Sequence, residues 1–312
     1  MKRLAIILLI LGLLAAVPAA HAAPSSAIKN LNETPGEMAT DTQRNAWVVI
    51  GGVNDTVARV KPSGDIKKYE IPELDNAGGV ALGHDDHMWF TVTNKGVVEL
   101  NPSDPKNVHE YDIDAIGDAR GITRGPAGRM YAASDDQLVS FKPSDPENFK
   151  HEAVAGMAAR GIAAAKTQIF VADFAGGRII KASQQLEVLK KFDVGGNPQQ
   201  VTTGPDGSVA YGNPGTDPQT VGRISANGKP KTTDLPAMTD PFGMAFMPDG
   251  KFWFTEFARN RMGTLTTGGN VHHVGGLIPN NSGPRYSGEG KNGVLFVGLE
   301  LADKIAILKG IN

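Results

Sequence analysis

The chain contains no cysteine, so no disulfide can stabilise it in any compartment. It also lacks a basic excess, because 31 Lys and Arg residues stand against 33 Asp and Glu, a formal net charge of −2. Nucleic acids and anionic membrane surfaces attract proteins with a clear basic excess. Neither is therefore expected as a partner, and stability must come from a core and from the way the fold closes.

Long apolar runs are missing after the N-terminus, where Leu4 to Val17 form one apolar stretch. Lys2-Arg3 precede it, and Ala20-His21-Ala22 follows as a small-x-small cleavage site, which is the pattern of a secretory signal peptide. The stretch is shorter than the roughly 20 residues that a membrane-spanning helix needs. We predict a signal peptide at 1–22 and a mature domain at 23–312. The mature protein is expected to be secreted or periplasmic, with no membrane attachment after cleavage.

A helical period free of glycine and proline is also absent from the mature chain, which disfavours a helical fold. Instead, Pro241 to Glu256 predicts a strand, a Pro-Asp-Gly turn and a second strand. The same frame recurs along the chain, with anchor positions 39 to 43 residues apart. One four-stranded propeller blade takes about 40 to 50 residues. The anchors are Trp47, Trp89, Tyr131, Phe170, Ala210, Trp253 and Phe296.

The seventh repeat ends early, since Lys304 to Leu308 is its third strand and the sequence stops at Asn312. Ala27 to Leu31, near the mature N-terminus, matches the outer strands of the other repeats. We therefore predict an all-β fold, a seven-bladed β-propeller whose N-terminal strand completes the last blade. Such closure removes the open sheet edges that invite aggregation, and we expect a monomer.

The segment from Pro248 to Gly269 resembles the repeat of the virginiamycin B (streptogramin) lyases, which reads roughly P-D-G, two aromatics, T-E, N-x-I-G and T-x-G. Gly204 to Gly207, followed by Val221 to Ile224, is a weaker copy. NHL-type and gluconolactonase-like propellers share much of this pattern. The resemblance implies a propeller with its site on one face of the central channel.

The resemblance also implies a catalytic set: a general-base histidine on the seventh blade, a histidine one blade earlier, and glutamates around a magnesium ion. In this sequence the two histidine positions hold Arg285 and Phe242. The glutamate positions hold Gly283 and Leu299, with Glu300 adjacent. Because an arginine cannot act as a base near neutral pH, the matched positions argue against streptogramin elimination.

Two rings of side chains are expected at the channel mouth, where ligands favour a concave surface. One ring begins the innermost strands: Gly36, Gly78, Arg120, Arg160, Gln199, Phe242 and Arg285. The other ends the second strands: Ile50, Val92, Ser134, Asp173, Asn213, Glu256 and Leu299. Their polar members are the candidate ligand-binding residues: Arg120, Arg160, Asp173, Asn213, Glu256 and Arg285.

The three arginines suit a carboxylate, phosphate or carbonyl-rich ligand, because a guanidinium binds such groups in pairs. Asp173 and Glu256 suit a cation or a ligand amine. The competing interpretation is that these charged residues pair with one another and line a water-filled channel. The segment His84 to His87 offers metal-ligand residue types, but it lies at a hairpin turn, where aspartates are favoured for local hydrogen bonding.

These features favour a propeller that binds a small molecule or peptide without the lyase reaction. One alternative is a metal-assisted lyase or lactone hydrolase with a rearranged site, which would use Mg²⁺ or Ca²⁺. Another is a protein-interaction scaffold that uses the rim. We predict no metal site, and no cofactor unless the protein is an enzyme.

Overall fold

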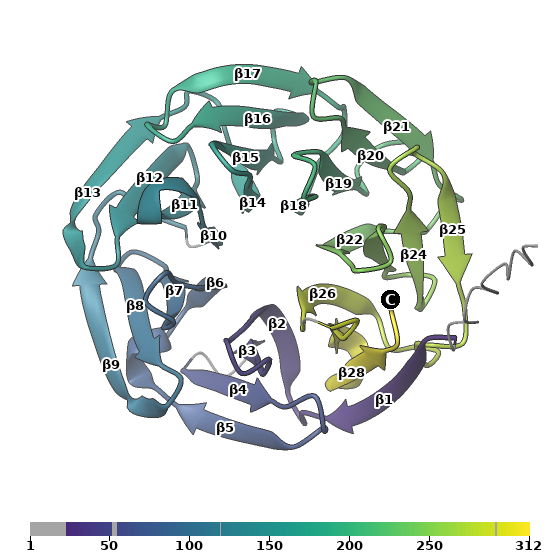
Figure 1. The fold of residues 1–312 in the computed structure, drawn as a ribbon, viewed down its shortest axis with the longest axis horizontal. Coiled ribbons are helices and arrows are strands. Elements are labelled where there is room, and N and C mark those ends of the chain that lie inside the picture. Colours follow the sequence, from purple (N-terminus) through teal and green to yellow (C-terminus); the bar gives the residue numbers. More distant parts are fainter. Residues whose placement is uncertain (1–22, 52–54, 119, 291) are drawn as a thin grey trace, which may run out of the picture.

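The computed structural model describes residues 23–51, 55–118, 120–290 and 292–312. Seven antiparallel sheets of four strands each are arranged in a closed ring, with successive blades following the chain around the circle (Figure 1). This confirms the predicted all-β, seven-bladed propeller. Within the described ranges, no helix is long and apolar enough to span a membrane. The predicted signal peptide, residues 1–22, lies outside the described residues.

The two inner strands of each blade carry the anchors and the start of the channel. The innermost strands are β2 (Thr34–Thr40), β6 (Ala77–Leu82), β10 (Gly121–Arg124), β14 (Ala159–Ala164), β18 (Val201–Thr203), β22 (Pro241–Phe246) and β26 (Pro284–Glu289). The second strands are β3 (Ala46–Gly51), β7 (Met88–Val92), β11 (Met130–Ser134), β15 (Gln168–Asp173), β19 (Val209–Asn213), β23 (Phe252–Glu256) and β27 (Leu295–Leu299).

The two outer strands complete each blade. The third strands are β4 (Thr56–Val60), β8 (Gly96–Asn101), β12 (Gln137–Lys142), β16 (Arg178–Ser183), β20 (Thr220–Ile224), β24 (Arg261–Leu265) and β28 (Lys304–Lys309). The outer strands are β5 (Ile66–Glu70), β9 (Asp104–Asp112), β13 (Asp145–Ala153), β17 (Val188–Asp193), β21 (Pro230–Asp234), β25 (Val271–Val274) and β1 (Ser25–Asn30). Three short 3₁₀ turns are η1 (Pro72–Leu74), η2 (Pro126–Gly128) and η3 (Glu300–Ala302).

The ring closes between the two ends of the chain. Strand β1 pairs antiparallel with β28, from Ser25 opposite Lys309 to Asn30 opposite Lys304, and the last sheet has the order β1-β28-β27-β26. The purple β1 accordingly lies beside the yellow β28 in Figure 1. The predicted N-terminal closure is confirmed. It supplies, by backbone hydrogen bonds, the link between the first and last segments that a cysteine-free chain cannot make covalently.

Each anchor lies on a second strand and is at most 3% exposed. On the innermost strand the residue opposite each anchor is alanine, glycine or threonine; for example, Ala39 faces Trp47, Thr123 faces Tyr131, and Gly288 faces Phe296. Because the innermost strands converge on the channel, there is little room between them, and the large side chains lie on the second strand of each blade. Burying each large side chain contributes about 1.5–3 kcal/mol to folding.

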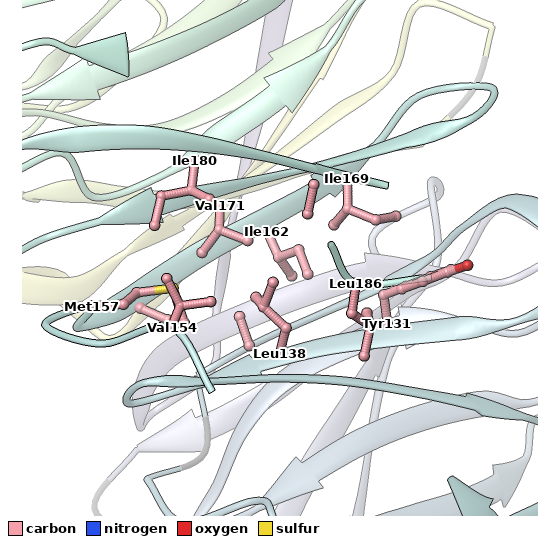
Figure 2. Close-up of a cluster of buried hydrophobic side chains, with 12 residues drawn as sticks. Tyr131, Leu138, Val154, Met157, Ile162, Ile169, Val171, Ile180 and Leu186 are labelled. Carbon is pink, nitrogen blue, oxygen red and sulfur yellow. The ribbon is translucent and has the colours of Figure 1, made fainter. Parts of the chain in front are cut away.

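The core lies mainly between neighbouring blades. Figure 2 shows one such cluster, in which Tyr131 and Leu138 of the third blade meet Ile162, Ile169 and Val171 of the fourth. Because every blade covers the face of the next, the blades stabilise one another, and the closed ring leaves no blade with a bare face.

Two outer strands contain a proline near their start. Strand β9 begins at Asp104 and β13 at Asp145, so Pro105 and Pro146 lie within strands. An outer strand has one unpaired edge, and proline is tolerated there because its missing N–H is not needed.

Candidate functional site

Five innermost strands begin with a β-bulge, in which two residues lie opposite a single residue of the second strand. In β2 the register shifts between Pro35 and Met38, so Gly36 and Glu37 oppose Val49. In β26 the shift between Pro284 and Ser287 does the same for Arg285 and Tyr286. The same shift occurs in β6, β14 and β22. A bulge redirects side chains, and here it exposes two successive positions to the channel.

These positions surround a cavity of about 460 Å³ at the end of the channel where the innermost strands begin. All seven residues of the first predicted ring line it, whereas from the second ring only Ile50 does. The lining residues are Gly36, Glu37, Val49, Ile50, Gly51, Asn76, Ala77, Gly78, Thr93, Asp118, Arg120, Arg160, Phe174, Gln199, Gln200, Phe242, Arg285 and Tyr286.

The three predicted arginines converge on this cavity but differ in their partners. Arg120 pairs with Asp118, and Arg285 pairs with Glu300 through Nη1, 2.9 Å from Oε2. Arg160 has no ion-pair partner within the described parts of the chain; its guanidinium carbon lies 4.8 Å from the centre of the Phe174 ring. Arg160 is thus the arginine of the three that makes no ion pair with a described residue, although the Asp118 charge also acts on it.

The electrostatics of the cavity reflect this convergence. Burial, with further contributions from the Arg120 and Arg285 guanidinium groups, lowers the pKa of Arg160, against the opposing effects of Asp118 and Tyr286. The Arg285 guanidinium also lies over Phe242, 4.3 Å from the ring centre, and its Nε is buried without a hydrogen-bond partner among the described residues. Partly desolvated guanidinium groups that repel one another are stabilised by an anion placed between them.

The other three candidates, Asp173, Asn213 and Glu256, do not line the cavity. All are fully buried at the ends of their second strands. Asp173 binds Arg178 of the next strand, at 2.6 Å, and Glu256 binds Arg261 and His273, each at 2.5 Å. The competing interpretation required the charged candidates to pair with one another. They pair instead with other residues or, in the case of Arg160, with none that the structure describes.

Sequence reasoning missed the second residue of each bulge. Four blades have glycine there or at the matching position, but Glu37, Gln200 and Tyr286 carry side chains that line the cavity. The Gln200 Nε2 donates a hydrogen bond to Glu37 Oε1, which joins the first blade to the fifth across the channel. A comparison of the repeats at the residue after each predicted ring member would have found these three side chains.

Glu37 has an unusual environment for a carboxyl group. Its side chain is only partly covered because it faces the cavity, yet protein surrounds it on its other sides. This desolvation raises the pKa of Glu37 to about 7, against the opposing effects of the Gln200 hydrogen bond and the Arg285 charge. Burial likewise raises the pKa of Tyr286 to about 12, and the Glu37 charge adds to the shift.

The segment His84 to His87 forms a hairpin turn, as the simpler interpretation predicts. Asp86 has φ of 65°, the left-handed conformation that Gly207 and Gly250 adopt in equivalent turns. The ligand atoms of Asp85, His87 and Glu99 lie within 4.8 Å of one another. Hydrogen bonds account for this grouping.

In that group the Trp89 indole donates to Asp85, the His87 ring contacts Glu99 at 2.5 Å, and the Tyr111 hydroxyl donates to Glu99. The first of these contacts recurs in two other blades, where Asp41 accepts from Trp47 and Asp249 from Trp253. The recurrence marks the turn aspartate as part of the blade architecture.

The positions matched to the lyase histidines, Arg285 and Phe242, lie together in the cavity. No histidine is among the described residues that line it. Leu299 is buried in the core, and the neighbouring Glu300 holds Arg285. His109, His151, His272 and His273 all lie on outer strands.

The fold defines a closed seven-bladed propeller with a polar cavity at one end of its channel. A sequence model of the virginiamycin B lyase family matches residues 148–310, which is slightly more than half of the chain. The chain therefore belongs to the virginiamycin B lyase family. A search of curated protein sequences finds no significant match.

Solved structures show the same fold at low identity. Virginiamycin B lyase from Staphylococcus aureus superposes with a TM-score of 0.78 at 18% identity, covering 92% of this chain and 99% of the lyase. A catalytically inactive form of that lyase, solved with quinupristin, also gives a TM-score of 0.78, at 17% identity and the same coverage. YCF48 bound to a D1 peptide gives 0.71 at 11% identity, covering 93% of this chain and 98% of YCF48.

Proposed function

We propose that this protein is an exported, virginiamycin B lyase-like propeller that binds a small molecule or peptide at the channel mouth without the family's lyase chemistry. The observation that carries the proposal is the convergence of Arg120, Arg160 and Arg285 on one cavity, where Arg160 lacks an ion-pair partner among the described residues. Guanidinium groups in a partly desolvated pocket bind carboxylate or phosphate oxygens strongly. Two solved structures of the same fold contain a ligand: virginiamycin B lyase with quinupristin, and YCF48 bound to a D1 peptide.

The cavity favours binding over elimination because it lacks a suitable base at the family's position. Arg285 stays protonated near neutral pH, and Phe242 has no ionisable group. The N-terminal pattern around Lys2-Arg3 and Ala20 to Ala22 supports export to the periplasm or the medium. Fractionation of cells expressing the full chain, with N-terminal sequencing of the product, tests export: a product beginning near Ala23 outside the cytoplasm is expected.

A metal-assisted lyase or lactone hydrolase is the competing function, and it would draw on Asp173 or Glu256. The carboxylate oxygens of both are already bound by arginines of their own blades. Mg²⁺ and Ca²⁺ take at least six oxygen ligands, and the cavity offers few. Sustained turnover of a cyclic depsipeptide or a lactone that requires Mg²⁺ or Ca²⁺ would overturn the binding-only proposal.

Binding is tested by calorimetry with carboxylates and phosphate against the wild type, Arg160→Ala and Arg124→Ala. Arg124 is a matched control, because it is an exposed arginine at the far end of β10, away from the cavity. We expect Arg160→Ala to weaken binding and Arg124→Ala to leave it unchanged. Equal affinity in all three proteins would show that the cavity is not the binding site.

A further inference from the structure

Among the described residues that line the cavity, Glu37 is the one carboxyl group without an arginine bound to it. It lies in the bulge of β2, and its Oε1 accepts the hydrogen bond from Gln200 across the channel. Its Oε2 makes no hydrogen bond with any residue that the structure describes, and the side chain lines the cavity. One carboxyl oxygen is therefore available to a molecule bound there.

The charged and titratable groups that face Glu37 come from β26 and η3. Arg285 and Tyr286 lie on β26, and Glu300 on η3 neutralises Arg285 through the ion pair. Gln200, which immediately precedes β18, contributes only its neutral amide. None of these groups is an unpaired cation that would stabilise a Glu37 carboxylate. Desolvation is therefore the largest effect on the pKa of Glu37 and brings it close to neutral pH.

The charge balance of the cavity selects a ligand with one negative charge. Asp118 already pairs with Arg120, and Glu300 pairs with Arg285, so Arg160 is the arginine of the three without an ion-pair partner among the described residues. A dianion would exceed this need and would face the Glu37 carboxyl at close range.

The remaining residues that line the cavity indicate which chemical groups the uncharged part of such a ligand should carry. Blades one and two contribute Val49, Ile50 and Ala77 together with glycines and the polar residues Glu37, Asn76 and Thr93. Three aromatic rings, Phe174, Phe242 and Tyr286, come from blades four, six and seven. A ligand with one anionic end against the arginines therefore has an apolar surface and aromatic faces for the remainder. This suits a small acid with an aromatic or aliphatic body.

We infer that the cavity takes an aromatic or aliphatic monocarboxylate, and that Glu37 binds this ligand in its protonated form, donating a hydrogen bond to it. The inference rests on the proposed function and names its ligand class and a specificity-determining residue. When the ligand binds above neutral pH, Glu37 takes one proton from the solvent, because a carboxylate beside the bound anion would be repelled. The carboxyl O–H then donates to the ligand, and no covalent bond forms or breaks in the protein.

The test is calorimetry with sodium benzoate from pH 5.5 to 8.5, in pairs of buffers that differ in ionisation enthalpy. For the wild type we expect uptake of about one proton per benzoate near pH 8, and an affinity that falls up to about tenfold per pH unit above 7. In Glu37→Gln the amide keeps a donor but cannot titrate, so affinity should be independent of pH and proton uptake absent. Benzamide and inorganic phosphate serve as the neutral and the more highly charged probes.

A second variant guards against misfolding of the first. Gln200→Ala removes the hydrogen bond that lowers the pKa of Glu37, so the fall in benzoate affinity should move to higher pH. Binding of benzoate with the same affinity at every pH, or a pH profile unchanged in Glu37→Gln, overturns the inference and leaves the proposed function standing. Phosphate binding that exceeds benzoate binding overturns the ligand class. Failure of benzoate, hexanoate and phosphate to bind at pH 5.5 contradicts the proposed function itself.

Discussion

The two rings of polar side chains at the channel mouth lie on the same face, but they make opposite kinds of contact. Arg120, Arg160 and Arg285 face a cavity, and one of them has no charged partner among the described residues. Asp173 and Glu256 are 0% exposed, and each is held by an arginine of the adjoining strand. The first ring therefore faces an open cavity, whereas the second ring holds the adjoining loops in place.

The second ring also supports the first. Asp173 Oδ1 accepts the backbone amides of Ala158 and Gly176, and Ala158 immediately precedes the strand that carries Arg160. Asn213 does the equivalent in the next blade, where it accepts the amide of Asn197. The buried polar residues thus fix the loops that lead into the innermost strands, and their hydrogen bonds satisfy backbone groups that would otherwise be buried without partners.

The largest expected effect is on the second ring. Asp173→Ala leaves the Arg178 charge and two backbone amides without their acceptor, so the free energy of unfolding should fall by about 3–5 kcal/mol. Urea denaturation followed by tryptophan fluorescence measures it. A loss below about 1 kcal/mol would show that this ring is not structural, since that is the scale of a surface ion pair.

The next effect separates Glu37 from the paired carboxylates. Because folding raises the pKa of Glu37 from 4.5 to about 7, the native state binds more protons than the unfolded state between these values. This group therefore costs no stability below about pH 4.5, and its cost grows as the pH rises to 7. Glu37→Gln should match the wild type in acid and exceed it by up to roughly 3 kcal/mol at pH 8.

Denaturation of both proteins at pH 4.5, 6 and 8 measures that difference. Glu256→Gln is the contrasting variant, because Arg261 and His273 bind its carboxylate. We expect it to be less stable than the wild type at pH 8. A stability gain in Glu256→Gln at that pH would remove the distinction between the two carboxyl groups.

Arg160→Ala should act on binding and not on folding. The side chain has no ion pair with any described residue, so the unfolding free energy should change by about 0.5 kcal/mol or less. The affinity for benzoate should fall about 10- to 100-fold, as loss of a charge-assisted hydrogen bond implies. Calorimetry and thermal melting of the same samples separate the two effects.

The smallest effect compares arginines within the first ring. The ion pair with Asp118 already neutralises Arg120, so Arg120 offers little net positive charge to a bound anion. We expect a loss of benzoate affinity of only about threefold, well below that of Arg160→Ala. Equal losses in the two variants would mean that the ion pair with Asp118 opens when the ligand binds.

The sequence predicted most of the fold because a propeller is a repeated unit. The anchor positions, the Pro-Asp-Gly turns at Gly207 and Gly250, and the missing outer strand of the seventh repeat all follow from comparing one repeat with another. The turn at His84 to His87 could be recognised in the same way. All of these features depend on neighbours in the sequence, within one repeat.

The candidate site was predicted only in part, because one residue was assigned to each blade where a bulge presents two. A bulge follows from how the innermost strands crowd at the channel, as the backbone of Arg285 close to Gly243 shows. Glu37 and Tyr286 were missed for this reason, and Gln200 lies at the matching position just before β18. The hydrogen bond between Glu37 and Gln200 joins residues 163 positions apart, which no local pattern encodes.

The sequence by itself determined the blades, their number and the strand that closes the ring, because hydrophobic spacing and turn residues act over short stretches of chain. Only the tertiary structure decided which charges are compensated. Asp173 meets Arg178 and not Arg160, Arg285 meets Glu300, and Glu37 reaches across the channel to Gln200. Electrostatic energies depend on distance and desolvation in three dimensions, and both are set when the seven blades close around the channel.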